Sequence, residues 1–119
     1  KYYMTDLGIA QIKNNNFEIN KYFAIENVVF NELVARGYEV YIGKLNPGEI
    51  DFIASKNGER KYFQVVYLLS DNKVEEREFG ALKKIEDNYP KYVISLDKTN
   101  FSQNGIIHKN IVDWLLEDD

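Results

Sequence analysis

The sequence predicts an α/β fold in which helices flank a mixed central sheet. Three observations predict it: an amphipathic helical pattern comes first, a hairpin with an Asn57-Gly58 turn follows, and a second helical pattern leads to the apolar run Tyr92 to Leu96. An uninterrupted apolar run of that length is typical of a buried parallel strand. Antiparallel strands followed by a helical crossover to a further strand give a mixed sheet with helices on its faces.

The chain is predicted to divide into a lead-in segment, residues 1–16, and a single domain, residues 17–119. Tyr2 to Ile12 are expected to form a short strand followed by a turn or a short helix. Asn20 is the predicted cap of a helix that runs to Arg36, and Gly37 is expected to end it in the left-handed conformation. The apolar residues at helical spacing are Tyr22, Phe23, Val29, Phe30 and Leu33.

Val40 to Ile42 are predicted to form the strand that precedes the hairpin. After the hairpin, Ser70 or Asp71 is expected to cap a second helix, and Pro90 lies beyond the end of that helix. The residues of this helix that are expected to face inward are Val74, Phe79, Leu82 and Ile85.

The C-terminal part is predicted to add one strand and one helix. After an Asn104-Gly105 turn, Ile106 to His108 are expected to pair as a last short strand, and Asn110 is expected to cap the final helix. The apolar residues of that helix are Ile111, Trp114 and Leu115.

Composition excludes several kinds of site. The 119 residues include no cysteine, which excludes a disulfide framework and a thiolate metal site and fits a reducing compartment. The 19 acidic residues outnumber the 15 basic ones, and the net charge of -4 argues against DNA binding by this chain alone. Two basic pairs, Arg60-Lys61 and Lys83-Lys84, are expected on solvated faces.

The apolar runs are strand-sized, so neither a membrane-spanning segment nor a membrane partner is expected. We expect no export leader and a cytoplasmic location. The first residue is Lys1, and we expect the chain to be part of a longer protein.

The sequence disfavours histidine-based metal or catalytic sites and also disfavours ATP binding. His108 is the only histidine and is expected at the surface of its strand, which excludes a His-rich metal site and leaves no partner for a Ser-His-Asp arrangement. The phosphate-binding motif Gly-x-x-x-x-Gly-Lys-Ser/Thr is absent, so ATP binding by this chain is not expected.

The hairpin is predicted to place several polar side chains on one face of the sheet. If Asn57 and Gly58 are the central residues of a type I′ turn, Lys56 pairs with Glu59, and the register sets Asp51 across from Gln64. Period-two alternation then puts a group of side chains on one face. They are Glu49, Asp51, Tyr62, Gln64 and Val66.

Glu26 is an acid at helical spacing from residues that are expected to face inward. A carboxylate in that position must be paired or protonated. Two interpretations remain open: Glu26 reaches toward the hairpin as part of a site, or it lies at the rim of the apolar stripe and is hydrogen-bonded to the sheet.

Glu26, Glu49 and Asp51 are the candidate metal ligands, because Mg²⁺ is usually held by one or two carboxylates together with substrate phosphates. Gln64 offers only a neutral amide, and Val66 cannot orient or deprotonate water. Metal binding is therefore expected to be weak or absent, and no cofactor is expected in this domain.

This hairpin resembles the site of PD-(D/E)XK (restriction-endonuclease-like) magnesium nucleases, in which an Asp on one strand faces a Glu on the next and a Lys follows two residues later. The resemblance implies a nuclease-like core and a relic catalytic site at Glu26, Asp51 and Gln64, with Val66 on the Lys position. Because Gln64 and Val66 replace the second acid and the Lys, the site is expected to be inactive.

The chain also resembles, nearly end to end, the C-terminal domain of unknown function of prokaryotic AAA+ family ATPases. The similar segments are KYYMTDLGIA at the start, AIENVVFNELVARGYEVYIGK from Ala24, GEIDFIA from Gly48, YFQVVY from Tyr62, and NYPKYVISLD with NGIIHKNIVDWL. The resemblance implies that a nucleotide-binding module, which holds the ATP, and a winged-helix-like region precede this domain.

Three functions are weighed on this basis. The first is a catalytically degenerate nuclease-like accessory or recognition module of an AAA+ ATPase, whose partners are the rest of that chain and a nucleic acid or protein. The second is a magnesium-dependent DNA endonuclease that uses Glu26, Glu49 and Asp51. The third is an assembly domain whose lead-in or last strand extends the sheet of another subunit, which would make a homo-oligomer.

Overall fold

A computed structural model describes residues 3–4, 7–11, 24–45 and 49–117. Within these residues seven strands form one sheet in the order in which they occur along the chain. The strands are β1 (Tyr3–Met4), β2 (Leu7–Gln11), β3 (Glu39–Leu45), β4 (Glu49–Lys56), β5 (Glu59–Val65), β6 (Lys91–Ser95) and β7 (Ile107–Asn110), and the helices are α1 (Ala24–Ala35), α2 (Asn72–Lys83) and α3 (Ile111–Leu116).

The sheet is mixed, as predicted. Neighbouring strands from β1 to β5 are antiparallel, whereas β5, β6 and β7 run parallel to one another. The change of direction occurs where α2 carries the chain from β5 to β6, because a parallel connection needs a crossover long enough to return to the same edge. The predicted α/β fold with a mixed central sheet is confirmed.

The lead-in segment differs from its prediction. Leu7–Gln11 form the strand β2, where a turn or a short helix was expected, and β2 pairs with β3. A strand is favoured here because β3 offers it a complete ladder from Leu7 to Gln11, and long-range pairing of this kind overrides local preference.

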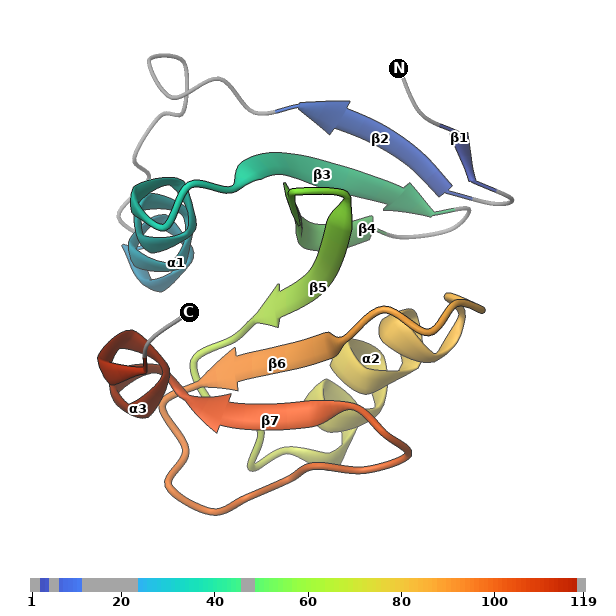
Figure 1. Ribbon diagram of the computed structural model, residues 1–119. Helices are drawn as coiled ribbons and strands as arrows, with labels where there is room; N and C mark the ends of the chain where they lie inside the picture. The colour runs from blue at the N-terminus through green and yellow to red at the C-terminus, as the bar shows by residue number, and fades with distance from the viewer. Residues whose placement is uncertain (1–2, 5–6, 12–23, 46–48, 118–119) are drawn as a thin grey trace.

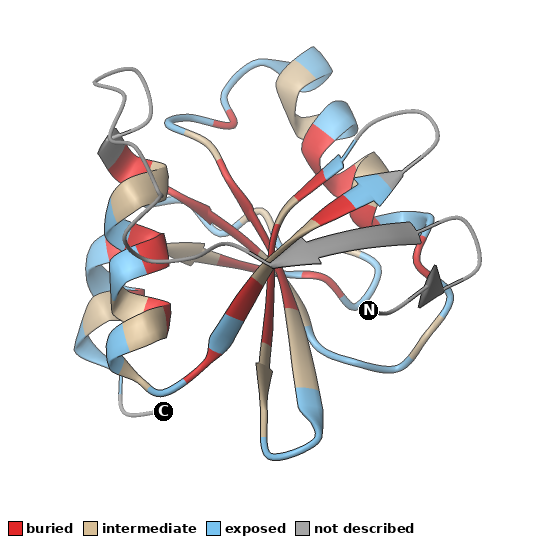
Figure 2. Cartoon of the chain, turned by 90° about the horizontal axis from the view of Figure 1, so that it is seen from above, coloured by how far each residue is buried: buried red, intermediate tan, exposed pale blue. Residues whose placement is uncertain are grey.

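Helices cover both faces of the sheet (Figure 1). α1 and α3 pack on one face, and α2 packs on the other. Figure 2 shows that the buried residues of each helix face the strands. The core therefore has two parts, an α1/α3 cluster that includes Phe30, Phe52, Phe63 and Trp114, and an α2 cluster that includes Ile53, Tyr62, Phe79 and Leu82.

The predicted boundaries of α1 are confirmed at its C-terminal end. Gly37 has φ +93°, a conformation that favours glycine, and the N–H groups of Gly37 and Tyr38 bond to the last carbonyls of the helix. Val29, Phe30 and Leu33 are buried, as expected. The expected start at Asn20 and the side chains of Tyr22 and Phe23 lie outside the described residues.

The other two helices begin where the capping residues predicted. Asp71 accepts a hydrogen bond from the Lys73 N–H at the start of α2, and Asn110 accepts from the N–H groups of Val112 and Asp113 at the start of α3. The predicted inward residues are buried or partly buried. Within the described residues, no helix is long and apolar enough to cross a membrane.

The hairpin turn has the geometry that its sequence predicts. Asn57 and Gly58 have φ +55° and +81°, which a type I′ turn requires at both central positions. Lys56 pairs with Glu59, and the register continues without a shift to Phe52 and Phe63. The register of the hairpin prediction is therefore confirmed over this stretch.

A bulge in β4 lies beside Asp51. Tyr41 pairs with Ile53 and Gly43 with Ile50, so Asp51 and Phe52 together lie opposite the single residue Ile42. Both Ile50 and Ile53 pack in the α2 cluster as a result. Bulges of this kind re-aim side chains and are common next to functional sites.

Candidate functional site

Asp51 and Gln64 join β4 and β5 beyond the last main-chain pair. Gln64 Oε1 accepts a hydrogen bond from the Asp51 N–H at 2.8 Å, and Asp51 Oδ2 accepts one from the Val65 N–H at 2.9 Å. Gln64 is 4% exposed. The predicted meeting of the two side chains is confirmed, and each satisfies a main-chain N–H whose burial without a partner costs about 1 to 3 kcal/mol.

An open pocket of about 470 Å³ lies between this pair and α2. Glu49, Asp51 and Gln64 line it from the strands, so these three side chains share one face as predicted. Val66 packs against the α2 cluster on the same face. The residues that line the pocket from α2 and its C-terminal end are Glu76, Arg77, Glu78, Gly80, Ala81 and Lys84.

Glu78 is a site residue that the sequence analysis missed. It is 9% exposed and lies on the buried face of α2, where its Oε2 accepts from Arg77 Nε at 3.1 Å. The signal was present, because Glu78 falls four residues from both Val74 and Leu82 and therefore interrupts the apolar stripe of α2.

Burial and like charge act together on these acids. Desolvation raises the pKa of Asp51 to about 7, the Val65 N–H opposes that shift, and the carboxylates of Glu26, Glu78 and Glu49 add to it. The pKa of Glu26 is also raised, mainly by desolvation and further by Glu78 and Glu49. Carboxylates from α1, β4 and α2 thus favour the protonated forms of Asp51 and Glu26.

Two interpretations of Glu26 were left open, a site residue that reaches the hairpin and an acid at the rim of the apolar stripe, and the structure agrees with each only in part. It is on α1, and its charge adds to the raised pKa of Asp51, although Glu26 is not among the residues that line the pocket. It is only partly buried, however, whereas a mostly buried side chain was expected. It lies near the N-terminal end of α1, whose side chains are less covered there than Val29, Phe30 and Leu33.

The acids do not form a metal centre in their present positions. Among the described residues, no three acidic or histidine side chains lie close enough together to hold one metal ion. Glu49 is exposed, and its Oε2 is bonded to Lys44 Nζ at 2.9 Å. Glu26, Glu49 and Asp51 could bind Mg²⁺ jointly only after a rearrangement of side chains.

Replacing Glu26 with Gln is expected to be tolerated or stabilising at neutral pH. A carboxyl with a raised pKa contributes stability at low pH and loses that contribution as the pH rises through the folded-state pKa, so an amide avoids the loss. Thermal melts at about pH 4.5 and about pH 7.5 measure this effect. A clear fall of the melting temperature at neutral pH would show that ionised Glu26 has a stabilising partner.

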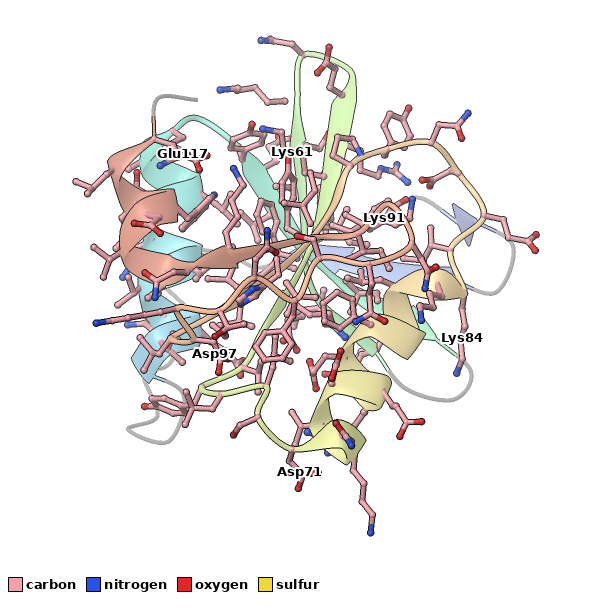
Figure 3. The ribbon with its side chains drawn as sticks, turned by 90° about the horizontal axis from the view of Figure 1, so that it is seen from below. Lys61, Asp71, Lys84, Lys91, Asp97 and Glu117 are labelled. Atoms are coloured by element: carbon pink, nitrogen blue, oxygen red, sulfur yellow. The ribbon has the colours of Figure 1, made fainter. Side chains whose placement is uncertain are left out.

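His108 contradicts its prediction. It is 6% exposed, not a surface residue, and it bonds to Ser95, which in turn bonds to Asp97. Figure 3 labels Asp97. His108 is covered because the loop after β6 returns over it, with the Phe101 ring edge-on at 5.4 Å. Desolvation lowers the pKa of His108.

The three side chains do come together, contrary to expectation, but not in the order of a hydrolytic triad. His108 Nδ1 accepts the Phe101 N–H at 3.1 Å, and its Nε2 lies 2.7 Å from Ser95 Oγ. Ser95 in turn donates to Asp97 Oδ2 at 2.7 Å. A catalytic histidine must instead accept the serine proton, so this network stabilises the ends of β6 and β7.

Comparisons with known proteins give two relatives. An uncharacterized protein of Haemophilus influenzae is 38% identical over 120 aligned positions, which cover 98% of this chain and 29% of that protein. Elongation factor G of Carsonella ruddii is 32% identical over 74 positions, which cover 57% of this chain and 11% of that protein. The chain thus spans less than a third of either relative.

No family model matches the chain. No solved structure matches it either.

Proposed function

We propose that this chain is a catalytically degenerate, nuclease-like α/β module that works by binding, as an accessory or recognition domain. The observation that carries the proposal is the reciprocal bonding of Asp51 and Gln64 to the main chain. Both side chains sit where a two-strand metal site needs its acids, and both are engaged in holding β4 to β5.

Metal-assisted hydrolysis requires charged ligands around the ion and a group that positions the attacking water. Burial raises the pKa of Asp51 to about 7, which disfavours its charged form, and Gln64 is a neutral amide. Val66 packs into the α2 cluster and offers no polar atom from its side chain. Gln64 and Val66 therefore supply neither the second charged ligand nor the cationic group that the reaction uses at these two positions of β5 and its end.

The proposed context is the C-terminal end of a prokaryotic AAA+ ATPase in the cytoplasm. Its support is the resemblance of the sequence segments to that family. In this proposal the ATP is bound by an N-terminal region of the longer protein, and the partners are the rest of the ATPase chain and a protein or nucleic acid that the ATPase acts on.

The proposal predicts that the domain neither binds Mg²⁺ measurably nor cuts DNA. Calorimetry with Mg²⁺ and Mn²⁺, together with cleavage assays on supercoiled and branched DNA, tests both parts. The double variant Gln64→Glu, Val66→Lys restores the missing acid and cation, and it should gain Mn²⁺ affinity if the pocket keeps the shape of a metal site.

Tight Mg²⁺ binding with cleavage by the unmodified domain would instead support the second candidate, a magnesium-dependent DNA endonuclease. The observation in favour of that candidate is Glu78, which adds a helix-borne carboxylate to Glu26, Glu49 and Asp51. Glu78→Gln should abolish cleavage in that case, while Glu86→Gln, the same change of charge at an exposed position after α2 and outside the pocket lining, should not.

An assembly function would need the edge strand β7 to pair with a strand of another subunit, and the structure gives little support for that pairing. The N–H of His108 in β7 donates to Ser102 Oγ at 2.8 Å, so one group that would receive a partner strand is already bonded. Light scattering of the isolated domain checks this directly, and a stable dimer would favour assembly.

A further inference from the structure

Two polar groups that line the pocket beside Asp51 and Gln64 bond to nothing within the described residues. One is the Gln64 amide NH₂: the residue is 4% exposed, and only its Oε1 is bonded, to the Asp51 N–H. The other is Asp51 Oδ1, since the Val65 N–H bonds to Oδ2. Every side-chain nitrogen or oxygen that is closed to solvent in the described residues has a partner, so both groups open onto the pocket.

The Asp51 carboxylate also has no counter-ion. It forms no ion pair within the part of the chain that the structure describes, whereas two other acids of the pocket do. Glu49 is paired with Lys44 at 2.9 Å, and Glu78 is paired with Arg77 at 3.1 Å. Burying a charge without a counter-ion is costly, so a cation supplied from outside would stabilise Asp51.

The surroundings of Asp51 are negative. The pocket lining contains four acidic residues and two basic ones, and Glu26 on α1 adds its charge to those that act on Asp51. Lys84, one of the two bases, is exposed at the end of α2 (Figure 3). A cleft lined mainly by one sign of charge concentrates ligands of the opposite sign, so the pocket favours a cation and disfavours an anion.

The two open groups set what a ligand must carry. Asp51 Oδ1 calls for a cation that donates hydrogen bonds, and the Gln64 NH₂ calls for an acceptor such as a carbonyl oxygen. A metal ion or a simple amine supplies the first of these and not the second. A lysine or arginine residue carries both, a basic side chain and a main-chain carbonyl.

The size of the pocket also fits such a residue. Its volume of about 470 Å³ lies within the range of ligand pockets, roughly 300 to 1,000 Å³. Gly80 and Ala81 form part of its wall, and an added Cβ at Gly80 would meet only open space. The aliphatic stem of a basic side chain can lie along these small residues while its charged end reaches Asp51.

We propose that this pocket binds the basic side chain of a lysine or arginine residue in a partner protein, with the cation on Asp51 and a carbonyl oxygen on the Gln64 NH₂. The inference rests on the proposed function, a module that works by binding, and names what the module recognises. A free basic amino acid has the same side chain, but its α-carboxylate is repelled by the acids of the pocket.

The test uses the 119-residue chain and blocked amino acids. The probes are the Nα-acetyl N-methylamides of lysine and arginine, and the controls are those of norleucine and citrulline, which have similar shapes and no charge. In ¹H–¹⁵N NMR titrations at low salt, the basic probes are expected to shift the side-chain NH₂ signal of Gln64 and the amide signals of Asp51 and Val65. The neutral probes are not, and free lysine should bind more weakly than blocked lysine.

Asp51→Asn should weaken the binding of both basic probes roughly tenfold or more at about pH 8, because it removes the charge that pairs with the cation. The amide can still accept the Val65 N–H, and a melting temperature at or above that of the unmodified chain would show that the loss does not come from unfolding. Asp113→Asn, the same change at an exposed position of α3, should leave binding nearly unchanged.

Gln64→Met tests the second contact. The unmodified chain should bind blocked lysine several-fold more tightly than n-butylamine, which has the cation and no carbonyl. Gln64→Met should lose that preference and still bind n-butylamine, which shows that the pocket remains folded. The same preference in both proteins would exclude Gln64 as the donor to the ligand.

Three further results would overturn the proposal. They are equal binding of the lysine and norleucine probes, equal losses of affinity in Asp51→Asn and Asp113→Asn, and tighter binding of free lysine than of blocked lysine, which would make the ligand a small molecule. The proposed function fails on a different measurement, Mg²⁺ binding with cleavage of DNA, so the two failures are distinguishable.

Discussion

Replacing Asp51 with Asn should make the protein more stable at about pH 8, by about 2 to 4 kcal/mol, and leave its stability nearly unchanged at about pH 4. Burial raises the pKa of this carboxyl from 3.8 to about 7. Because the pKa of Asp51 is higher in the folded state, this group contributes stability at a pH below its unfolded-state pKa. That contribution is lost as the pH rises through about 7, its folded-state pKa. A difference of that size between the folded-state and unfolded-state pKa values corresponds to about 4 kcal/mol in the free energy of unfolding.

The geometry of the site supports the Asn substitution. An amide oxygen at position 51 can accept the Val65 N–H as the carboxylate does, and it brings no charge toward Glu26 and Glu78. Urea denaturation followed by the fluorescence of Trp114, the single tryptophan, measures the free energy of unfolding at each pH.

Asp113→Asn, at an exposed position of α3, is the matched control and should show little dependence on pH. A loss of stability in Asp51→Asn at about pH 8 would mean that the ionised carboxylate stabilises the fold through the Val65 N–H, which would contradict the raised pKa.

Replacing Gln64 with Glu, without added metal, should destabilise the protein by about 3 to 5 kcal/mol at about pH 8. Gln64 is 4% exposed and bonds to the Asp51 N–H, so a carboxylate there adds a buried charge directly beside Asp51. The two acids would then share one proton, as paired carboxylates do, and the folded-state pKa of the pair would rise.

The sign of the pH dependence follows from that rise. The loss of stability in Gln64→Glu should be small at about pH 4, where both acids are protonated, and should grow as the pH increases. Gln64→Met removes the amide without adding charge and separates the two effects, since it should cost only about 1 to 3 kcal/mol for the unsatisfied Asp51 N–H at every pH. Equal losses in the two variants at about pH 8 would show that the added charge is not buried.

Local sequence signals were sufficient for much of the fold. The Asn57-Gly58 turn set the hairpin register, because its backbone conformation restricts the residue types that can occupy it. Asp71, Asn110 and Gly37 marked helix ends for the same local reason. The apolar run that forms β6 indicated a buried parallel strand, since both of its faces must be covered.

Features whose structure depends on residues far away in the sequence were missed or predicted wrongly. β2 forms because β3 offers it a ladder, which nothing within Leu7–Gln11 reveals. His108 is buried because the loop after β6 folds back over it.

The same division applies to the pocket beside Asp51 and Gln64. The sequence by itself determined that Asp51 and Gln64 meet, because strand period and turn type are local properties that leave one register. Only the tertiary structure decided what they do there. The bulge in β4 lies beside Asp51, whose carboxylate accepts the Val65 N–H, and the packing of α2 brings Glu78 to the pocket. Burial and charge depend on every element that surrounds a group, and so they emerge only when the sheet and its helices are assembled.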